Sequence, residues 1–494
     1  MSGIKNKLIK GTAWLSISRL IVNSLAMLST IVLARLLSPA DFGLIAVATT
    51  MLLVITEVTE LSLSAALIRH TAPLQSHFDA AWTLNAVRGV ILGGLFALAG
   101  WPVASIYKEP RLVLVMIALG FSVFLSGLVN PRRIMLQRDL IFWQEFVLNV
   151  AQKLVGVVVS VAVAYFYKSY WALVVGTLAS QATNVIISYT VVPFRPRITF
   201  AHTKELLSFS VWLTAIQIVN TLNWRFDYLF IGKMLGNSVL GFYSVGSNLA
   251  SMPTRETTAP LKQTFFPGFS SIHDDRVRLA AGYQRAQAFV TAVALPAGIG
   301  AALIADPLIR LTMGEKWEPV IFIMQTLAAV YALQTLGSLV DSLGMAQGKT
   351  RLLFKRSLQM LLIRVPVIVA ALWFYGLPGV ILARVCTGLF STWMNMDMVR
   401  RFTGLSVLQQ LSSNVRSLTS VGVMAVGVIL ANRGFTNALD TQSLLIKIGS
   451  IMGLAALLYC GMTVLLWVLM RKPMGPEQEV YQLMGKLFRK VCGG

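Results

Sequence analysis

Cysteine, histidine and negative charge are all scarce in this 494-residue chain. It contains three cysteines, four histidines and 20 acidic residues, against 42 Lys and Arg. Cys386, Cys460 and Cys492 lie far apart and none belongs to a CxxC pair, so the sequence favours neither a disulfide framework nor a cysteine metal site. The histidines fall in predicted loops without metal-ligand spacing or a paired nucleophile. These absences argue against metal-dependent and nucleophilic catalysis.

Charged residues of either sign are also few, whereas apolar residues dominate. Only 13% of the sequence is charged, 56% is hydrophobic, and the mean hydropathy is +0.71. Soluble domains carry about a quarter charged residues. A helix needs roughly 20 apolar residues to cross the hydrocarbon core, and the chain contains about fourteen such runs with little sequence between them. The sequence therefore predicts an all-α polytopic membrane protein with no room for a soluble domain.

The predicted transmembrane helices follow one another along almost the whole chain. They cover residues 12–34, 42–63, 82–104, 112–130, 144–166, 170–192, 208–231, 239–260, 286–305, 319–340, 354–375, 378–398, 417–432 and 444–470. The first run is too long for the apolar region of a signal peptide and has no small-residue cleavage site behind it. We therefore expect it to be retained and the mature chain to start at Met1.

Lys and Arg residues between the predicted helices fall mainly on one side of the membrane. That side includes Lys5, Arg132 and Lys355, whereas the sparsely charged side includes Arg35 and Lys108. Because positively charged loops stay in the cytoplasm, both termini are predicted to be cytoplasmic. The net charge of +22 is then largely a matter of topology and of contact with anionic lipid head groups, and it requires no nucleic-acid partner.

The C-terminal tail, residues 471–494, has a basic amphipathic pattern. Apolar residues recur at helical spacing after Pro476, with Lys486, Arg489 and Lys490 between them. We expect a short helix on the inner leaflet; a catalytic or partner-binding tail is the alternative.

A short connector between apolar runs occurs twice in the chain. "LARLLSPADFG" (33–43) and "IGKMLGNSVLG" (231–241) align without a gap, so that Gly43 corresponds to Gly241, an offset of 241 − 43 = 198 residues. Weak internal symmetry of this kind is typical of transporters built from two structural repeats, and chance similarity between apolar runs is the alternative. An even number of predicted helices separates the copies. Both connectors should therefore lie on the same face of the membrane, in parallel repeats.

The repeat leads to a prediction of domain organisation. We expect an N-terminal lobe of about six helices in residues 1–200, and a C-terminal lobe of the same kind in residues 201–400. The lobes would face each other across a central cleft, and residues 401–470 would add two further helices.

Several charged residues fall inside the predicted spans. A charge at mid-bilayer costs at least about 2.5 kcal/mol on insertion scales, so such residues usually face a polar interior and mark a pathway. The candidate substrate-binding cations are Arg19, Arg88, Lys153, Arg225 and Arg364. The candidate cavity acids or gating partners are Glu57, Glu60, Asp227, Arg255 and Glu256. Snorkelling or structural pairing is the alternative, above all for Arg255. Because cations outnumber acids in the spans, the cavity should prefer an anionic passenger, and guanidinium groups suit phosphate oxygens.

No cofactor-binding motif stands out in the sequence. "GMAQGKT" (344–350) has three residues between its glycines, where a phosphate-binding loop has four, and it follows a membrane helix and not a strand. We expect no nucleotide, metal or other cofactor.

The connector and three further stretches resemble a known family. "LARLLSPADFGLIAVA" (33–48), "LSLSAALIRH" (61–70), "LQRDLIF" (136–142) and "FSVWLTAIQIVNTLNWRFDYLFIGKMLG" (209–236) resemble the polysaccharide transporters of the MOP flippase superfamily. These are the Wzx-type lipid-linked oligosaccharide flippases, and within them the chain resembles the exopolysaccharide branch, of the succinoglycan transport kind. The resemblance covers nearly the whole chain.

The resemblance implies a multi-pass protein of the bacterial inner membrane that is not an enzyme. Its substrate would be a polyprenyl-diphosphate-linked repeat unit, which alternating access through a cationic central cavity would carry to the periplasmic leaflet. The unit would serve exopolysaccharide, O-antigen or capsule biosynthesis. Membrane lipids and, further along the pathway, polysaccharide polymerase and export proteins are the expected partners.

Other functions leave different sequence signals. A multidrug exporter of the same superfamily would favour carboxylates in its cavity, because its passengers are lipophilic cations. A membrane glycosyltransferase or polymerase would carry a long external loop or external acids, whereas no external loop clearly exceeds about fifteen residues. A non-transporting assembly subunit would have no need of cations inside its helices.

Topology can be tested by thiol labelling in a variant that lacks the three native cysteines. Single cysteines at Ser38 and Asn237 should react with an impermeant reagent added from the periplasmic side, because both connectors are predicted to face it, whereas a cysteine at Ser271 should not. Labelling of only one connector would rule out the parallel repeat.

Overall fold

The computed structural model describes residues 2–58, 67, 73–138, 142–201, 203, 211–433, 440–471, 475 and 477–478. Every regular element in these ranges is a helix, which confirms the all-α prediction. Ten helical segments among them are long and apolar enough to cross a membrane, and each predicted span coincides with a helix. The predicted amphipathic tail lies almost wholly outside the described residues.

The chain divides into two compact units, Met1–Ser244 and Val245–Gly494. This boundary falls inside a helix and lies after residue 200, where the repeat predicts the first lobe to end. The two lobes defined by the repeat stay a prediction. The first unit contains α1 (Ser2–Leu36), α2 (Pro39–Val58), α4 (Gln75–Leu98), α5 (Gly100–Tyr107), α6 (Arg111–Gly127), η1 (Pro131–Arg133), α7 (Ile134–Arg138), α8 (Phe142–Tyr167), α9 (Trp171–Val191), α11 (Val211–Leu235) and the first turns of α12 (Asn237–Ser270).

The second unit contains the rest of α12 and the helices that follow it. These are α13 (Arg276–Leu303), α14 (Ala305–Thr312), η2 (Glu315–Trp317), α15 (Glu318–Gln334), η3 (Thr335–Gly337), α16 (Val340–Ala346), α17 (Thr350–Thr403), α18 (Val407–Ser412), α19 (Val415–Asn432) and α20 (Thr441–Leu469). Gly376, at a φ of +60°, breaks α17 into two limbs. The limbs account for the two spans predicted at 354–375 and 378–398.

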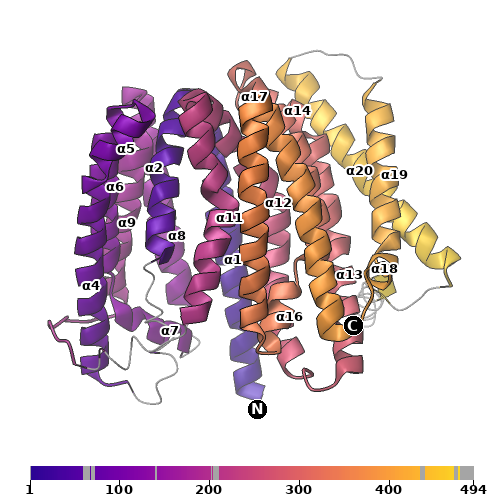
Figure 1. Cartoon of the computed structure of the whole chain (residues 1–494), viewed down its shortest axis with the longest axis horizontal. Helices are drawn as coiled ribbons and strands as arrows, with labels where there is room; N and C mark the ends of the chain where they lie inside the picture. The colour runs from indigo at the N-terminus through magenta and orange to yellow at the C-terminus, as the bar shows by residue number, and fades with distance from the viewer. Residues whose placement is uncertain are drawn as a thin grey trace, which may run out of the picture. The chain divides into compact units, whose positions relative to one another are not determined.

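Packing within each unit follows the apolar and small residues. In the first unit α6 packs between α4 and α9, and α8 packs on α1 and α9 (Figure 1). Gly93 and Gly120 bring α4 and α6 into backbone contact, since a β-carbon on Gly93 would lie 2.6 Å from the Gly120 carbonyl oxygen. In the second unit α13, α19 and α20 share an apolar cluster that includes Leu295, Val421 and Ile451.

The GxxxG pattern at Gly449 and Gly453 does not mark a similar contact. A β-carbon on either glycine would meet nothing within 4 Å in this structure. Close helix packing therefore accompanies the GxxxG glycines of α4 and not those of α20.

The connector before α2 folds as its sequence dictates. The Ser38 hydroxyl accepts a hydrogen bond from the Asp41 amide at 3.3 Å, while the Asp41 carboxylate accepts one from the Ser38 amide at 2.9 Å. This reciprocal arrangement is a capping box, and Pro39 suits the first helical position because its missing N–H would have no partner there. "SPAD" therefore ends one membrane helix and starts the next within two residues.

The two copies of the connector meet in the first unit. A β-carbon on Gly43 would lie 1.7 Å from the carbonyl oxygen of Asn237, and one on Gly241 would lie 1.8 Å from that of Pro39. The offset of 198 residues maps Gly43 onto Gly241 and Pro39 onto Asn237, so the two contacts are equivalent under the repeat. This reciprocity places both connectors on the same face, as the sequence predicted, and it explains why both copies keep glycine.

Polar contacts surround the paired connectors. Lys233 donates to the carbonyl of Ile106, and the Tyr107 hydroxyl donates to the carbonyl of Leu229 at 2.9 Å. Glu109 accepts two hydrogen bonds from Arg111 at 2.8 Å and one from the Asn237 amide at 3.0 Å. The Arg111 guanidinium, helped by Asn237, holds the pKa of Glu109 below its ordinary value. The turn between α5 and α6 is thus bound to the second connector.

The ends of α8 and of the first limb of α17 also have similar sequences. Tyr165, Phe166 and Tyr167 are followed by Lys168 at a φ of +46°, and Trp373, Phe374 and Tyr375 by Gly376 at +60°. All six aromatic side chains are largely exposed. Aromatic residues in such positions are typical of the boundary between lipid and water, so both hairpins should end at that boundary.

The connector contact can be tested by adding one carbon atom. Gly43→Ala and Gly241→Ala should each lower stability by about 1–3 kcal/mol, because the new methyl group meets a backbone carbonyl that cannot turn away. Gly94→Ala is the matched control, since it adds a methyl group in open space on α4. Thermal unfolding of the purified variants measures the difference, and equal melting of Gly43→Ala and Gly94→Ala would show that the connectors do not meet.

Candidate functional site

The candidate cations of the first unit lie on four different helices. Arg88 on α4 is half-buried and donates to the Thr56 carbonyl oxygen at 2.8 Å. This hydrogen bond joins α4 to α2 next to Glu57. Glu60, the other acid predicted for this region, lies outside the described residues.

Arg225 and Asp227 both lie on α11 and make separate contacts. The Arg225 guanidinium lies 4.9 Å from the centre of the Tyr228 ring, a cation–π arrangement. Asp227 is fully buried and accepts a hydrogen bond from the Tyr243 hydroxyl at the start of α12. Asp227 thereby joins α11 to α12.

Arg19 and Lys153 occupy α1 and α8, two helices that pack together. Both side chains are half-buried. The nearby rings of Trp14, Trp143 and Phe146 form an aromatic cluster between the same helices, with centroids 4.7–5.3 Å apart.

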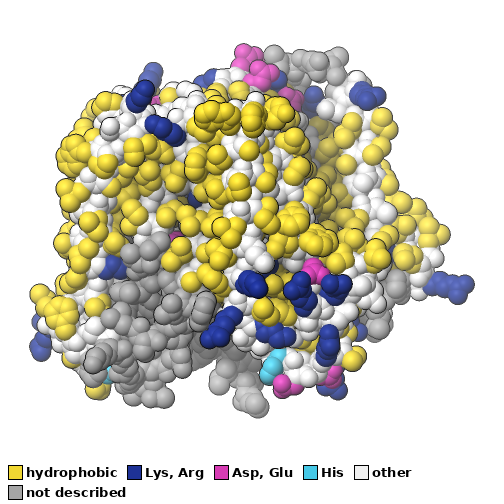
Figure 2. Space-filling model, viewed as in Figure 1, with side chains coloured by type: hydrophobic (Ala, Val, Ile, Leu, Met, Phe, Trp, Pro, Cys, Tyr) yellow, Lys and Arg dark blue, Asp and Glu magenta, His cyan; other side chains and the backbone are white. Residues whose placement is uncertain are grey.

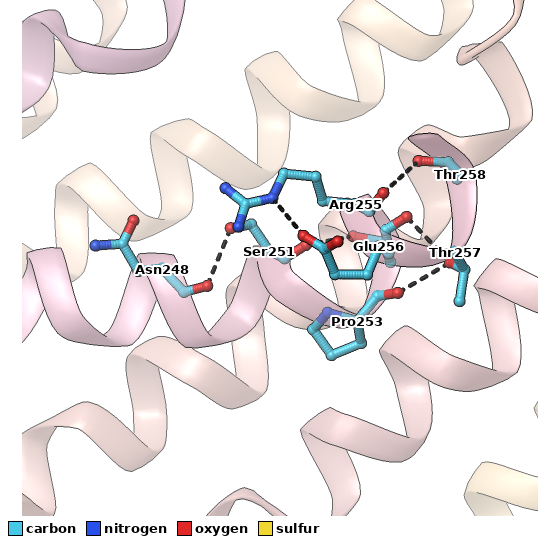
Figure 3. A network of polar contacts seen from close by, with 8 residues as sticks. Asn248, Ser251, Pro253, Arg255, Glu256, Thr257 and Thr258 are labelled. Atoms are coloured by element: carbon cyan, nitrogen blue, oxygen red, sulfur yellow. Dashed lines mark hydrogen bonds and ion pairs between the residues drawn. The ribbon is translucent and has the colours of Figure 1, made fainter. Parts of the chain in front are cut away.

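In the second unit a polar face runs along α12. Asn248, Ser251, Arg255, Thr258 and Lys262 recur at intervals of three, four or seven residues, which places them on one side of the helix. The Arg255 guanidinium contacts the adjacent Glu256 carboxylate at 3.1 Å, and the Arg255 side chain remains 61% exposed (Figure 3). Arg255 therefore pairs with Glu256 while most of the Arg255 side chain stays exposed.

Proline interrupts the hydrogen-bond ladder of this polar helix. α12 contains Pro253, Pro260 and Pro267. The Thr257 hydroxyl donates to the Pro253 carbonyl at 2.9 Å, and the Thr258 hydroxyl lies 3.4 Å from the Arg255 carbonyl (Figure 3). The two threonine hydroxyls thus satisfy their hydrogen-bonding groups within their own helix.

Arg364 lies on a buried stripe of α17. Arg356, Met360, Arg364 and Ile368 recur every four residues and all are buried, with Arg364 only 5% exposed. Arg356 donates to the Asn395 side-chain oxygen at 2.9 Å and to the Asp341 carboxylate at 3.1 Å. Arg356 lies near the start of the predicted span 354–375 and is not among the candidate cations predicted from the sequence, although its spacing of eight residues from Arg364 places both on one face.

Lys262 lies on α12, two residues after the predicted span that ends at 260. Burial lowers the pKa of Lys262, Asp341 partly offsets this, and Arg356 adds to it. The sequence did not mark Lys262 as a candidate, because its position after the predicted span 239–260 places it among the loop charges.

Exposed basic residues surround the same end of the second unit. Lys349, Arg351, Lys355, Arg400 and Arg401 are exposed at the ends of α17. Figure 2 shows Lys and Arg side chains gathered near the lower ends of α16 and α17 in this view, below a broad area of hydrophobic side chains. Asp397 pairs with both Arg400 and Arg401, at 2.7 and 2.8 Å. The surface keeps a positive excess.

Each unit thus gathers its own set of polar groups. The described residues contain no group of three or more His, Cys, Asp or Glu that could hold a metal ion. Arginine and lysine beside amide and hydroxyl groups can bind an anion and hydrogen-bond to sugar hydroxyls.

Comparisons with known proteins agree with this architecture. Residues 32–322, more than half of the chain, match the family described as "Polysaccharide biosynthesis protein". The chain is 24% identical to the lipopolysaccharide biosynthesis protein WzxC of Escherichia coli K12, over 83% of this chain and 84% of WzxC. It is 22% identical to the teichuronic acid biosynthesis protein TuaB of Bacillus subtilis 168, over 88% and 92% of the two chains.

The fold is that of a solved flippase. The structure of the lipid II flippase MurJ in an inward closed conformation superposes with a TM-score of 0.73 at 13% identity, and the match covers 92% of this chain and 98% of MurJ. Since the identity is low, this likeness establishes the fold alone. The family match, which covers residues of both units, establishes more: the chain belongs to the polysaccharide biosynthesis protein family, the Wzx-type flippases, and is a multi-pass membrane transporter and not an enzyme.

Proposed function

We propose that this protein flips a polyprenyl-diphosphate-linked oligosaccharide repeat unit from the cytoplasmic to the periplasmic leaflet of the bacterial inner membrane, with both termini in the cytoplasm. The observation that carries the proposal is the pair of arginines on one buried stripe of α17, together with the polar face of α12 in the same unit. Family membership supports the same function, as do the excess of Lys and Arg and the short polar connectors.

The passenger's chemistry matches these groups. A lipid diphosphate carries several negative oxygens next to a hydroxyl-rich sugar and a long apolar tail. Arg364 and Arg255 supply planar guanidinium groups that bind phosphate oxygens in pairs, whereas Asn248 and Ser251 supply neutral groups for sugar hydroxyls. The tail needs no protein site, because it remains in the hydrocarbon of the membrane throughout.

Arg255 supports a polar pathway for an energetic reason. Its side chain is more than half exposed although it lies within the predicted span 239–260. An exposed guanidinium in hydrocarbon would be costly, so such residues face a water-filled or polar interior. We therefore place the polar face of α12 on the path of the head group.

Alternating access is the proposed mechanism. Gly376 and the prolines of α12 and α17 divide long helices into shorter limbs, which can tilt without losing their own hydrogen-bond ladders. The passenger's head group would bind while the site is open to the cytoplasm and leave once the site is open to the periplasm.

The first test concerns the choice of passenger. Purified protein in liposomes should flip a diphosphate-linked oligosaccharide at least about tenfold faster than a neutral glycolipid with the same sugar, equivalent to about 1.4 kcal/mol of discrimination. A reductant that destroys a fluorescent label only in the outer leaflet measures the rate. Equal rates for both lipids would show that the buried cations do not select the passenger.

The second test concerns Arg364. Arg364→Gln should express normally, because it removes an expensive buried charge, while transport should fall at least about tenfold. Arg364→Lys should retain part of the activity if charge alone matters, and little if paired guanidinium bonds are required. The matched control is Arg351→Gln, an exposed arginine on the same helix.

Two outcomes would assign Arg364 a different role. Full transport by Arg364→Gln would remove this residue from the binding site. Poor expression of the same variant would instead make Arg364 a structural residue whose loss strands a buried partner.

A further inference from the structure

Residues 193–200, which follow α9, lie along the start of α4 without forming a helix, and we call them the strap. The Arg197 amide donates to the Asp79 carboxylate at 3.2 Å. Two residues later, the Thr199 amide donates to the Thr83 hydroxyl at 3.1 Å. Two residues of the strap therefore match four residues of α4, about 6 Å along the helix axis, which is the rise of an extended chain. The strap runs in the same direction as α4, toward the membrane.

These hydrogen bonds place the strap at the edge of the membrane. The apolar span predicted at 82–104 begins between Asp79 and Thr83. Thr199 is therefore level with the first residues of the span, whereas Arg197 is level with the last turn before it. This is the side of the membrane that the loop charges predict to be cytoplasmic.

The strap also lies on the side of α4 that faces lipid. Three exposed apolar residues follow Thr83 at intervals of four, seven and fifteen residues, which places them on the same side of the helix. They are Val87, Val90 and Leu98. Apolar side chains that are exposed within a membrane span contact hydrocarbon. Thr83 itself is buried, with the Thr199 amide bound to it.

The outer side of the strap carries apolar and basic side chains. Ile198 and Phe200 are two residues apart on an extended chain, so they share one side of it, and they are 79% and 62% exposed. Arg195 and Arg197 are exposed as well, and neither guanidinium forms an ion pair with any residue that the structure describes. Apolar side chains at this level gain from contact with lipid, and unpaired guanidinium groups beside them favour phosphate.

We propose that the strap is a binding surface for anionic phospholipid of the inner leaflet. Ile198 and Phe200 enter the boundary between head groups and acyl chains, and Arg195 and Arg197 bind the phosphate groups above it. The contact fastens the connection between α9 and α11 to the membrane surface beside α4. It is separate from passenger transport, because ordinary phospholipids supply both the apolar and the anionic group.

Spin labels can measure how deep the strap lies. In full-length protein without the three native cysteines, Ile198→Cys, Val90→Cys and Val277→Cys each carry one label in nanodiscs. Oxygen concentrates in lipid and a nickel chelate stays in water, so the two relaxation agents report depth. Val277 is 80% exposed and precedes the predicted span 286–305, which makes it the matched control in water. The Ile198 label should lie between the other two, and a label as accessible to nickel as that at Val277 would overturn the proposal.

Lipid composition tests the head-group contact. Adding phosphatidylglycerol to phosphatidylcholine nanodiscs should raise the ratio of immobilised to mobile label at Ile198 about thirtyfold, roughly fivefold for each arginine. Arg195→Gln/Arg197→Gln should abolish this increase. Arg351→Gln/Lys355→Gln, which removes two exposed cations of α17, is the control and should keep it.

Three results would overturn anionic lipid as the partner. The label could be equally immobilised with and without phosphatidylglycerol, which would leave an apolar contact alone. The control variant could lose the increase, which would assign it to the overall charge of the protein. Arg195→Gln/Arg197→Gln could unfold at a lower temperature than wild type, although exposed side chains contribute little to stability, which would make the two arginines structural residues.

Discussion

Hydrocarbon provides no hydrogen-bond partners, and most of this structure follows from that constraint. Each backbone group within the bilayer needs a partner in its own segment, which is why every regular element of the described chain is a helix. The same constraint acts on side chains: the Arg88 guanidinium donates to the carbonyl of Thr56, and the Thr257 hydroxyl donates to the carbonyl of Pro253 within its own helix. Buried charges also need partners, as the pairing of Arg356 with Asn395 and Asp341 illustrates.

Apolar composition and charge were enough to predict the class of fold. Runs of about 20 apolar residues located each membrane helix, because the bilayer imposes one length on all of them. The connector repeat could also be recognised in the sequence. Its residues have definite structural roles, because "SPAD" caps a helix and Gly43 and Gly241 have no room for a side chain. What the sequence could not provide was the reciprocal contact between the connectors, which depends on how α2 and α11 pack.

The candidate site was harder to predict than the fold. Arg88, Arg225 and Arg364 were selected by their predicted depth in the membrane alone. In the structure Arg88 binds a backbone carbonyl of α2, Arg225 lies over a tyrosine ring, and Arg364 lies on a buried stripe of α17. Lys262 and Arg356 escaped notice because a residue near a helix end resembles a loop charge when only hydropathy is considered. Which of these cations act together depends on the distances between helices, and these distances cannot be obtained from a single sequence.

The reciprocal glycine contact has a consequence for the origin of the molecule. Gly43 packs on Asn237 and Gly241 packs on Pro39, so the two copies of the connector make equivalent contacts with each other. In homodimers this is an isologous interface, the contact that a two-fold axis generates between identical subunits. A single chain with such an interface retains the geometry of a dimer whose genes were duplicated and joined.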